Sequence, residues 1–236
     1  MSIRHKAVVA TLDRGLANQW NNDHHFDPTD EILHVCLIPG PALADHWNTI
    51  QTAGGSAPAW AMTANHAWVV LNTGGVTDQI SSMRHELEAA VSNITHPNDL
   101  PVLTFSMQIV TVHDAAGVAN SVVEIGFQDD TDALFTQNLH HALFRVYNGN
   151  VYAVTGDGAA ETETLIAAYN EYGVYRIEFT STQVKFYVDD LVNAAATHTT
   201  NLPTADLTIK ASVRSKNNVD STIRLDSLAW RRLRKQ

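Results

Sequence analysis

The chain has 236 residues, of which 44% are hydrophobic and only 17% charged, so it can bury a substantial core in one large β domain or in a medium domain with a small appendage. Its formal net charge of −10 argues against general binding of DNA or RNA, because nucleic acids require a cationic surface. The sequence contains neither a run of 18 apolar residues, as a transmembrane helix requires, nor a hydrophobic signal core at its start. The one cysteine, Cys36, lies in an apolar run and is expected in the core, and it excludes an intrachain disulfide.

Residues 1–29 are predicted to form an N-terminal arm with a short helix. Asp13 is a suitable N-cap, and Leu16 and Trp20 follow at helical spacing on one side. A helix this short is marginal alone, so Leu16 and Trp20 are expected to anchor the arm on the main domain, a sister subunit or a larger assembly. Asp27-Pro28 ends the segment.

Residues 30–236 are predicted to form an all-β domain. Apolar and polar residues alternate in short segments separated by turn-prone residues, which favours a β-sandwich or jelly roll. Asn148-Gly149 marks the clearest hairpin, and the segment at residues 83–92 favours a strand over a helix. The predicted strands cover residues 32–38, 47–52, 67–72, 79–89, 102–112, 122–128, 142–147, 151–155, 163–168, 174–180, 184–188, 207–213 and 222–230.

Several segments resemble the concanavalin A-like jelly roll of lectins and glucanases. They are "LTFSMQIVTV", "SVVEIGFQDD", the hairpin "ALFRVYNGNVYAVTGDG", "YGVYRIEFTSTQVKFYVDDLVNAAATHTTNLP" and the closing "STIRLDSLAWRR". The quoted segments lie between residues 103 and 232, and the resemblance is taken to extend over roughly residues 30–232. The resemblance implies the fold but not the function, since this fold serves lectins, hydrolases and structural modules.

The leader "KAVVATLDRGLANQWNNDHHFD" is similar to the short N-terminal leaders of tail-fibre, spike and decoration proteins of bacterial and archaeal viruses. That resemblance implies an N-terminal anchor on a virion or an oligomer, with the jelly roll displayed outward. The chain ends with a basic segment, for which the sequence allows a solvated terminus or docking on an acidic neighbouring subunit. Its arginines are Arg231, Arg232 and Arg234.

Catalytic carboxylates are the first chemistry to look for in this fold. Glucanases of this fold carry them on one strand as Glu-x-Asp-x-(x)-Glu, because alternate strand positions hold two carboxylates about 5 Å apart. Here Glu124 is followed by Gly126 instead of a second acid, and Glu86 and Glu88 have no third acid after them. The sequence also has no Gly-x-Ser-x-Gly nucleophile motif, phosphate loop or dinucleotide fingerprint. We therefore expect no enzymatic activity and no required cofactor.

Two acidic features could hold Ca²⁺, a cation that prefers six to eight oxygen ligands. One is a loop with Asp129, Asp130 and Asp132, and the other is Asp226, where relatives of this fold hold a structural Ca²⁺. For the loop, the alternative is an ordinary acidic strand connection, and for Asp226 it is an outward position on the last strand. The adjacent pairs His24-His25 and His140-His141 are each expected to face opposite ways, which argues against zinc.

Sugar binding requires exposed aromatic rings for stacking, near polar groups that bind hydroxyls. The candidates are Trp47, Trp60, Tyr169 and Tyr172, with Trp68 as a further aromatic, and burial in the core is the alternative for each.

The first functional hypothesis is a non-enzymatic virion protein: a capsid decoration, spike or tail-fibre component, expected as a homotrimer in contact with other virion proteins. A carbohydrate-binding module that attaches to a host glycan is the second, and a glycoside hydrolase of the same fold is the third. Neither nucleic acid binding nor membrane insertion is expected.

Overall fold

The computed structural model describes residues 31–35, 47–51, 59–62, 67–85, 95–111, 122–129, 131, 134–169, 172–216 and 218–233. Only the backbone is described for residues 31–35, 48–51, 59–62, 67 and 232–233. The predicted N-terminal arm lies outside these ranges, as do Leu16, Trp20, Cys36, Glu86 and Glu88. Within the described ranges, no helix is long and apolar enough to cross a membrane.

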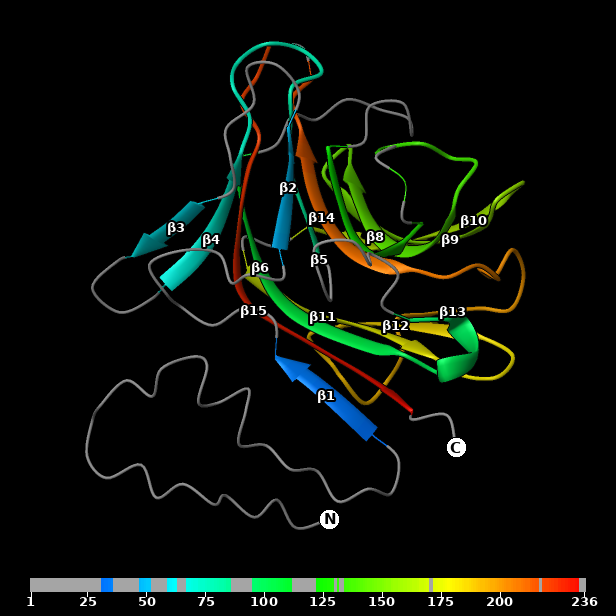
Figure 1. Ribbon diagram of the computed structural model, residues 1–236. Helices are drawn as coiled ribbons and strands as arrows, with labels where there is room; N and C mark the ends of the chain where they lie inside the picture. Colours follow the sequence, from blue (N-terminus) through cyan, green and yellow to red (C-terminus); the bar gives the residue numbers. More distant parts are fainter. Residues whose placement is uncertain are drawn as a thin grey trace, which may run out of the picture.

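Two antiparallel sheets face each other, and both bend around a shared core (Figure 1). The eight-stranded sheet has the order β13-β12-β11-β6-β15-β4-β3, with β1 paired to β15. Its strands are β1 (Glu31–Val35), β3 (Ala59–Met62), β4 (Ala67–Asn72), β6 (Val102–Thr111), β11 (Tyr172–Phe179), β12 (Val184–Val188), β13 (Ala196–His198) and β15 (Thr222–Leu233).

The seven-stranded sheet has the order β10-β9-β8-β7-β14-β5-β2. Its strands are β2 (Trp47–Gln51), β5 (Ile80–His85), β7 (Val123–Gln128), β8 (His140–Tyr147), β9 (Asn150–Asp157), β10 (Glu161–Ala168) and β14 (Thr208–Arg214). A 3₁₀ turn, η1 (Pro97–Asp99), is the one helical element of the described residues.

The core lies between the two sheets, because alternate side chains of each strand point inward. Phe144 of one sheet meets Phe105, Tyr175 and Phe186 of the other, with ring centroids 5.1 to 6.0 Å apart. Each of these side chains is at most 1% exposed, and burying one stabilises the fold by about 1.5–3 kcal/mol. Burial, with the charge of Asp189, raises the pKa of Tyr175 to about 12.

Most predicted strands are confirmed within a few residues, and the all-β prediction holds. Residues 67–72 and 184–188 are strands with the predicted bounds, whereas Ala59–Met62 and Ala196–His198 are strands that we did not predict. Asn148 and Gly149 both have positive φ angles, 49° and 68°, as the predicted tight hairpin turn requires. Of the segment at 83–92, residues 83–85 belong to β5, and the remainder lies outside the described residues.

The predicted basic tail is partly incorporated into the last strand. β15 runs to Leu233, and Arg231 and Arg232 pair with Leu33 and Ile32 of β1. These two arginines are therefore part of the sheet rather than of a free terminus, while Arg234 lies outside the described residues.

Candidate functional site

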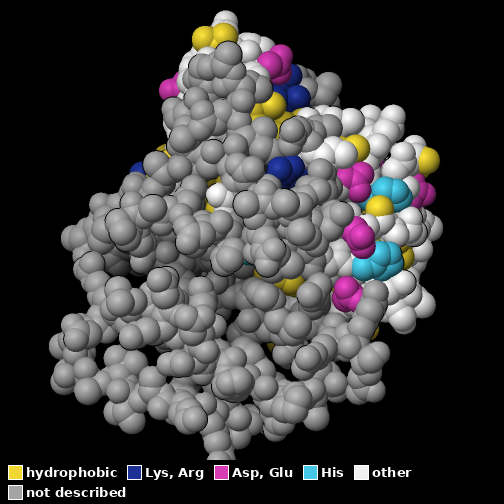
Figure 2. All heavy atoms as spheres, in the orientation of Figure 1, with side chains coloured by type: hydrophobic (Ala, Val, Ile, Leu, Met, Phe, Trp, Pro, Cys, Tyr) yellow, Lys and Arg dark blue, Asp and Glu magenta, His cyan; other side chains and the backbone are white. Residues whose placement is uncertain are grey.

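The outer face of the seven-stranded sheet, the face turned away from the core, carries a cluster of charged side chains, some of which are almost completely buried. Val123, Ile125 and Phe127 belong to the core, so alternation turns Glu124, Gly126 and Gln128 of β7 to the outer face. Pairing brings Arg145 of β8 directly beside Glu124. In the view of Figure 2, acidic and histidine side chains gather on the side of the molecule where β8, β9 and β10 lie.

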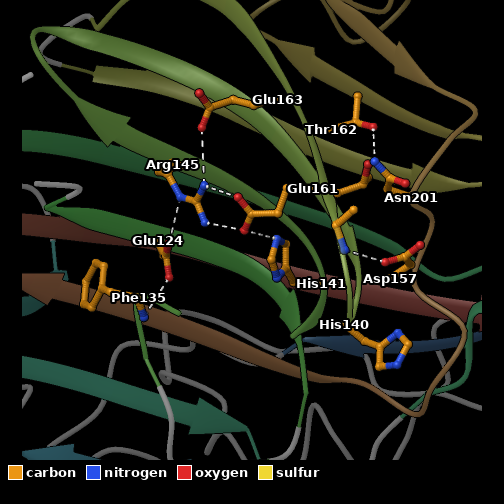
Figure 3. Close-up of polar contacts among 12 residues, drawn as sticks. Glu124, Phe135, His140, His141, Arg145, Asp157, Glu161, Thr162, Glu163 and Asn201 are labelled. Atoms are coloured by element: carbon orange, nitrogen blue, oxygen red, sulfur yellow. Dashed lines mark hydrogen bonds and ion pairs between the residues drawn. The ribbon is translucent and has the colours of Figure 1, made fainter. Parts of the chain in front are cut away.

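Arg145, which is 1% exposed, is the centre of this cluster (Figure 3). Its Nε donates to Oε1 of Glu124 at 2.8 Å. Its two terminal nitrogens donate to Glu161 on β10, each at 3.0 Å, and Nη1 also donates to Glu163 at 3.3 Å. Burial alone would lower the pKa of Arg145, but the charge of Glu124 and the hydrogen bonds to Glu161 outweigh it, and the pKa is raised. We call these four residues the Arg145 network.

The second oxygen of Glu124 is also occupied. The backbone N–H of Phe135 donates to Oε2 at 3.1 Å, and the side chain of Glu124 is only 3% exposed. The guanidinium of Arg214 lies 4.3 Å from the centre of the Phe135 ring, which holds the Phe135 segment over this face. Burial lowers the pKa of Arg214. Both carboxylate oxygens of Glu124 therefore have fixed protein partners.

A glycine allows a histidine to join the network. His141 and Glu161 both pair with Gly156 of β9, and Nε2 of His141 lies 3.0 Å from Oε1 of Glu161. A Cβ atom on Gly156 would lie 2.7 Å from the His141 ring and from the carbonyl oxygen of Leu139. Burial would raise the pKa of Glu161, but the contacts with His141 and Arg145 outweigh it and lower the pKa.

Two tyrosines extend the face beyond Arg145. Tyr147 and Tyr152 stack in parallel, with ring centroids 4.2 Å apart, and the Tyr147 hydroxyl donates to Oε1 of Glu163 at 2.6 Å. Burial and this hydrogen bond raise the pKa of Tyr147. Every carboxylate of the Arg145 network therefore accepts at least two polar contacts from the protein.

The contacts of the glutamates bear on the chemistry that each could perform. Contacts with His141 and Arg145 lower the pKa of Glu161, whereas a raised pKa favours a general acid, and each oxygen of Glu124 already accepts one hydrogen bond from the protein. On the face that Glu124 shares, the next outward positions of β7 are Gly126 and Gln128, and neither supplies a second carboxylate. A structural role is consistent with these contacts, because the buried charges neutralise one another.

The predicted sugar-binding aromatics occupy different environments. Trp47 is 9% exposed, belongs to the core and lies edge-on to His85. Tyr169 is partly buried against the core, and only the backbone of Trp60 is described. Tyr172 is 45% exposed, lies edge-on to Trp68, and its hydroxyl lies 3.4 Å from Asp226. The structure thus brings together two residues, Tyr172 and Asp226, that the sequence assigned to different kinds of site.

The predicted metal ligands are only partly described. Asp129 accepts a hydrogen bond from the backbone N–H of His140 at 2.9 Å, while Asp130 and Asp132 lie outside the described residues. His140 and His141 face opposite ways, as expected: His140 Nδ1 accepts from the N–H of Thr204, and His141 faces Glu161. No group of three or more His, Cys, Asp or Glu in the described ranges is arranged to hold a metal ion.

Solved structures with the same architecture come from enzymes and from a lectin. The chain is similar to the β-glucanase of Bacillus licheniformis (TM-score 0.56, 13% identity, 89% of this chain and 100% of that one). It is also similar to the exoplasmic/lumenal domain of VIP36 bound to Ca²⁺ and Man3GlcNAc, with a TM-score of 0.56 and 10% identity over 86% of this chain and 90% of that one. A third similar structure is the alginate lyase A1-II′, with a TM-score of 0.55 and 11% identity over 79% of this chain and 94% of that one.

No protein-family model and no curated protein matches the chain. The structural likeness establishes the concanavalin A-like jelly-roll fold, and at these identities it establishes the fold alone.

Proposed function

We propose that this protein is a non-catalytic jelly-roll module that serves in display and attachment, as a decoration, spike or fibre component of a virion. The observation that carries the non-catalytic part is the buried environment of Glu124 and its fixed protein partners. Arg145 and Phe135 occupy its two carboxylate oxygens, and its side chain is 3% exposed. The virion part is supported by the resemblance of the leader at residues 6–27 to virion leaders.

The catalytic part is tested by incubating the purified full chain with a panel of β-glucans, mannans and alginates. Reducing ends report hydrolysis, and ultraviolet absorbance of unsaturated uronates reports lyase activity. We expect neither signal. Products that disappear in Glu124→Gln or Glu161→Gln, with folding intact, would establish an enzyme and overturn the proposal.

The assembly part is tested by the absolute mass of the full chain in solution, measured by light scattering. A module displayed on a virion is expected as an oligomer, and a homotrimer is the expected state. Trp20→Ala should reduce the oligomer mass if the N-terminal arm holds the subunits together. A monomer at all concentrations, in both the parent and Trp20→Ala, would remove the support for an assembly role.

A further inference from the structure

Tyr172 is an exposed aromatic residue on the outer face of the eight-stranded sheet. Its ring centroid lies 6.2 Å from that of Trp68 at an interplanar angle of 79°, and Trp68 itself is only 9% exposed. The register places Gln108 of β6 beside Tyr172, and Arg224 of β15 beside Gln108. Nη1 of Arg224 donates to Oε1 of Gln108 at 3.2 Å. The tyrosine therefore borders a row of polar side chains and is positioned by a buried tryptophan.

A β-bulge in β15 adds a carboxylate and a hydroxyl to this row. The pairing of β15 with β6 shifts between Leu225 and Ser227, while Leu225 and Leu228 remain in the core. Asp226 and Ser227 consequently both reach the outer face: Asp226 approaches the Tyr172 hydroxyl, and Ser227 Oγ donates to Ser106 Oγ at 3.2 Å. Bulges commonly redirect side chains in this way next to functional sites.

The carboxylate of Asp226 has unused capacity to accept hydrogen bonds. It is partly buried, yet its one contact within the described chain is the 3.4 Å approach of the Tyr172 hydroxyl, and no described cation pairs with it. An ionised carboxylate accepts several hydrogen bonds, so the acceptor positions of Asp226 that the protein does not use are open to the hydroxyls of a ligand. Glu124 on the other sheet differs, because each of its carboxylate oxygens accepts a hydrogen bond from the protein.

We propose that Trp68, Gln108, Tyr172, Arg224, Asp226 and Ser227 form a glycan-binding surface, which we call the Tyr172 surface. This rests on the proposed function, because an attachment module needs a recognition surface outside any active site. The apolar face of a pyranose stacks on Tyr172, and two of its hydroxyls donate to Asp226. Gln108, Arg224 and Ser227 provide further donors and acceptors for ring and hydroxyl oxygens.

The charges on this surface favour a glycan over a cationic peptide. An aromatic ring beside a carboxylate would also suit a lysine or arginine side chain. Arg224, however, lies in the same row and repels such a cation, while it donates well to the oxygens of a sugar. Sugar hydroxyls both donate and accept, as a row with one carboxylate, one guanidinium, an amide and a serine requires.

The test is binding of the full chain to an array of immobilised oligosaccharides, with affinities of the hits measured by calorimetry. Tyr172→Ala is expected to weaken binding by about tenfold or more, because it removes the stacking ring. Tyr172→Phe keeps the ring and is expected to bind within about threefold of the parent, and Asp226→Asn is expected to lie between the two. Leu165→Ala is the matched control, since it shortens a 56% exposed side chain on the other sheet.

Thermal unfolding of each variant separates loss of binding from loss of fold. Glycan binding that Tyr172→Ala leaves unchanged would overturn the proposal, as would a parent that binds no glycan on the array. Binding of Lys- or Arg-rich peptides in place of glycans would overturn it in favour of a protein partner. If the chain binds no glycan and releases no products from polysaccharides, the non-catalytic assignment would be kept and the glycan-binding role of the Tyr172 surface would be rejected.

Discussion

Replacing Arg145 with methionine should strongly destabilise the protein, because it leaves a buried carboxylate without its cation. The side chain of Glu124 is 3% exposed and would retain only the Phe135 N–H, at 3.1 Å. Removing one partner of such a pair costs about 3–5 kcal/mol. Glu163, with 24% of its side chain exposed, adds little because water screens it. For a domain of this size, that loss lowers the melting temperature by about 6–20 °C.

The assay is urea unfolding followed by circular dichroism, on Arg145→Met, Glu124→Gln and the double variant. The double variant removes both charges, so it should recover a large part of the stability lost in Arg145→Met. Lys216→Met is the control, because its partner Asp78 is 60% exposed, and its loss should stay below about 1 kcal/mol. A loss below about 1 kcal/mol in Arg145→Met would refute the reasoning, as would a double variant no more stable than that single variant.

Two of three further predictions concern the same sheet, and the third concerns His198 on β13 of the eight-stranded sheet. The pKa of Glu161 is lowered in the folded protein, so its stabilising effect is present above the ordinary pKa of 4.5 and is lost as the pH falls below it. The unfolding free energy of Glu161→Gln should therefore decrease less steeply below pH 4.5 than that of the parent. Burial lowers the pKa of His198, so its contribution to the unfolding free energy should be fully present above pH 6.5 and should decrease as the pH falls below that value. In His198→Gln, the unfolding free energy measured against pH should lack this decrease. Gly156→Ala should lower the free energy of unfolding in urea by about 1–3 kcal/mol, because the new Cβ would lie 2.7 Å from both the His141 ring and the Leu139 carbonyl oxygen. The same contact should displace the His141 ring, and an unshifted His141 signal in nuclear magnetic resonance spectra would contradict this expectation.

The fold was predictable because alternation within one strand is a local signal. Tyr175, Ile177 and Phe179 alternate with polar residues in the sequence, and all three are buried in β11. Ala59–Met62 and Ala196–His198 were missed because strands of three or four residues are too short for alternation to show. Each is defined by its pairing with the neighbouring strand, β3 with β4 and β13 with β12, and not by a pattern of its own.

The Arg145 network was not predictable to the same extent. Glu124 was singled out as an acid, but its partner Arg145 lies 21 residues away and reaches it only through the register of β7 with β8. The available signal was a charged residue inside the otherwise apolar "ALFRVY", which argues for a buried ion pair. Nothing in the sequence identifies which acid supplies it. Tyr172 and Asp226 present the same difficulty at a separation of 54 residues.

The two outer faces use carboxylates in opposite ways, and this difference bears on where function lies. On the seven-stranded sheet, the guanidinium of Arg145 and the amide of Phe135 saturate Glu124, so the charge contributes to a closed scaffold. On the eight-stranded sheet, a bulge turns Asp226 outward beside an exposed ring, and no described cation neutralises it. A buried carboxylate with fixed protein partners is out of reach of a ligand, whereas a partly exposed one with open acceptor positions can bind ligand hydroxyls. Recognition is therefore expected at Asp226 and Tyr172, on the face opposite to the one whose acids first suggest catalysis.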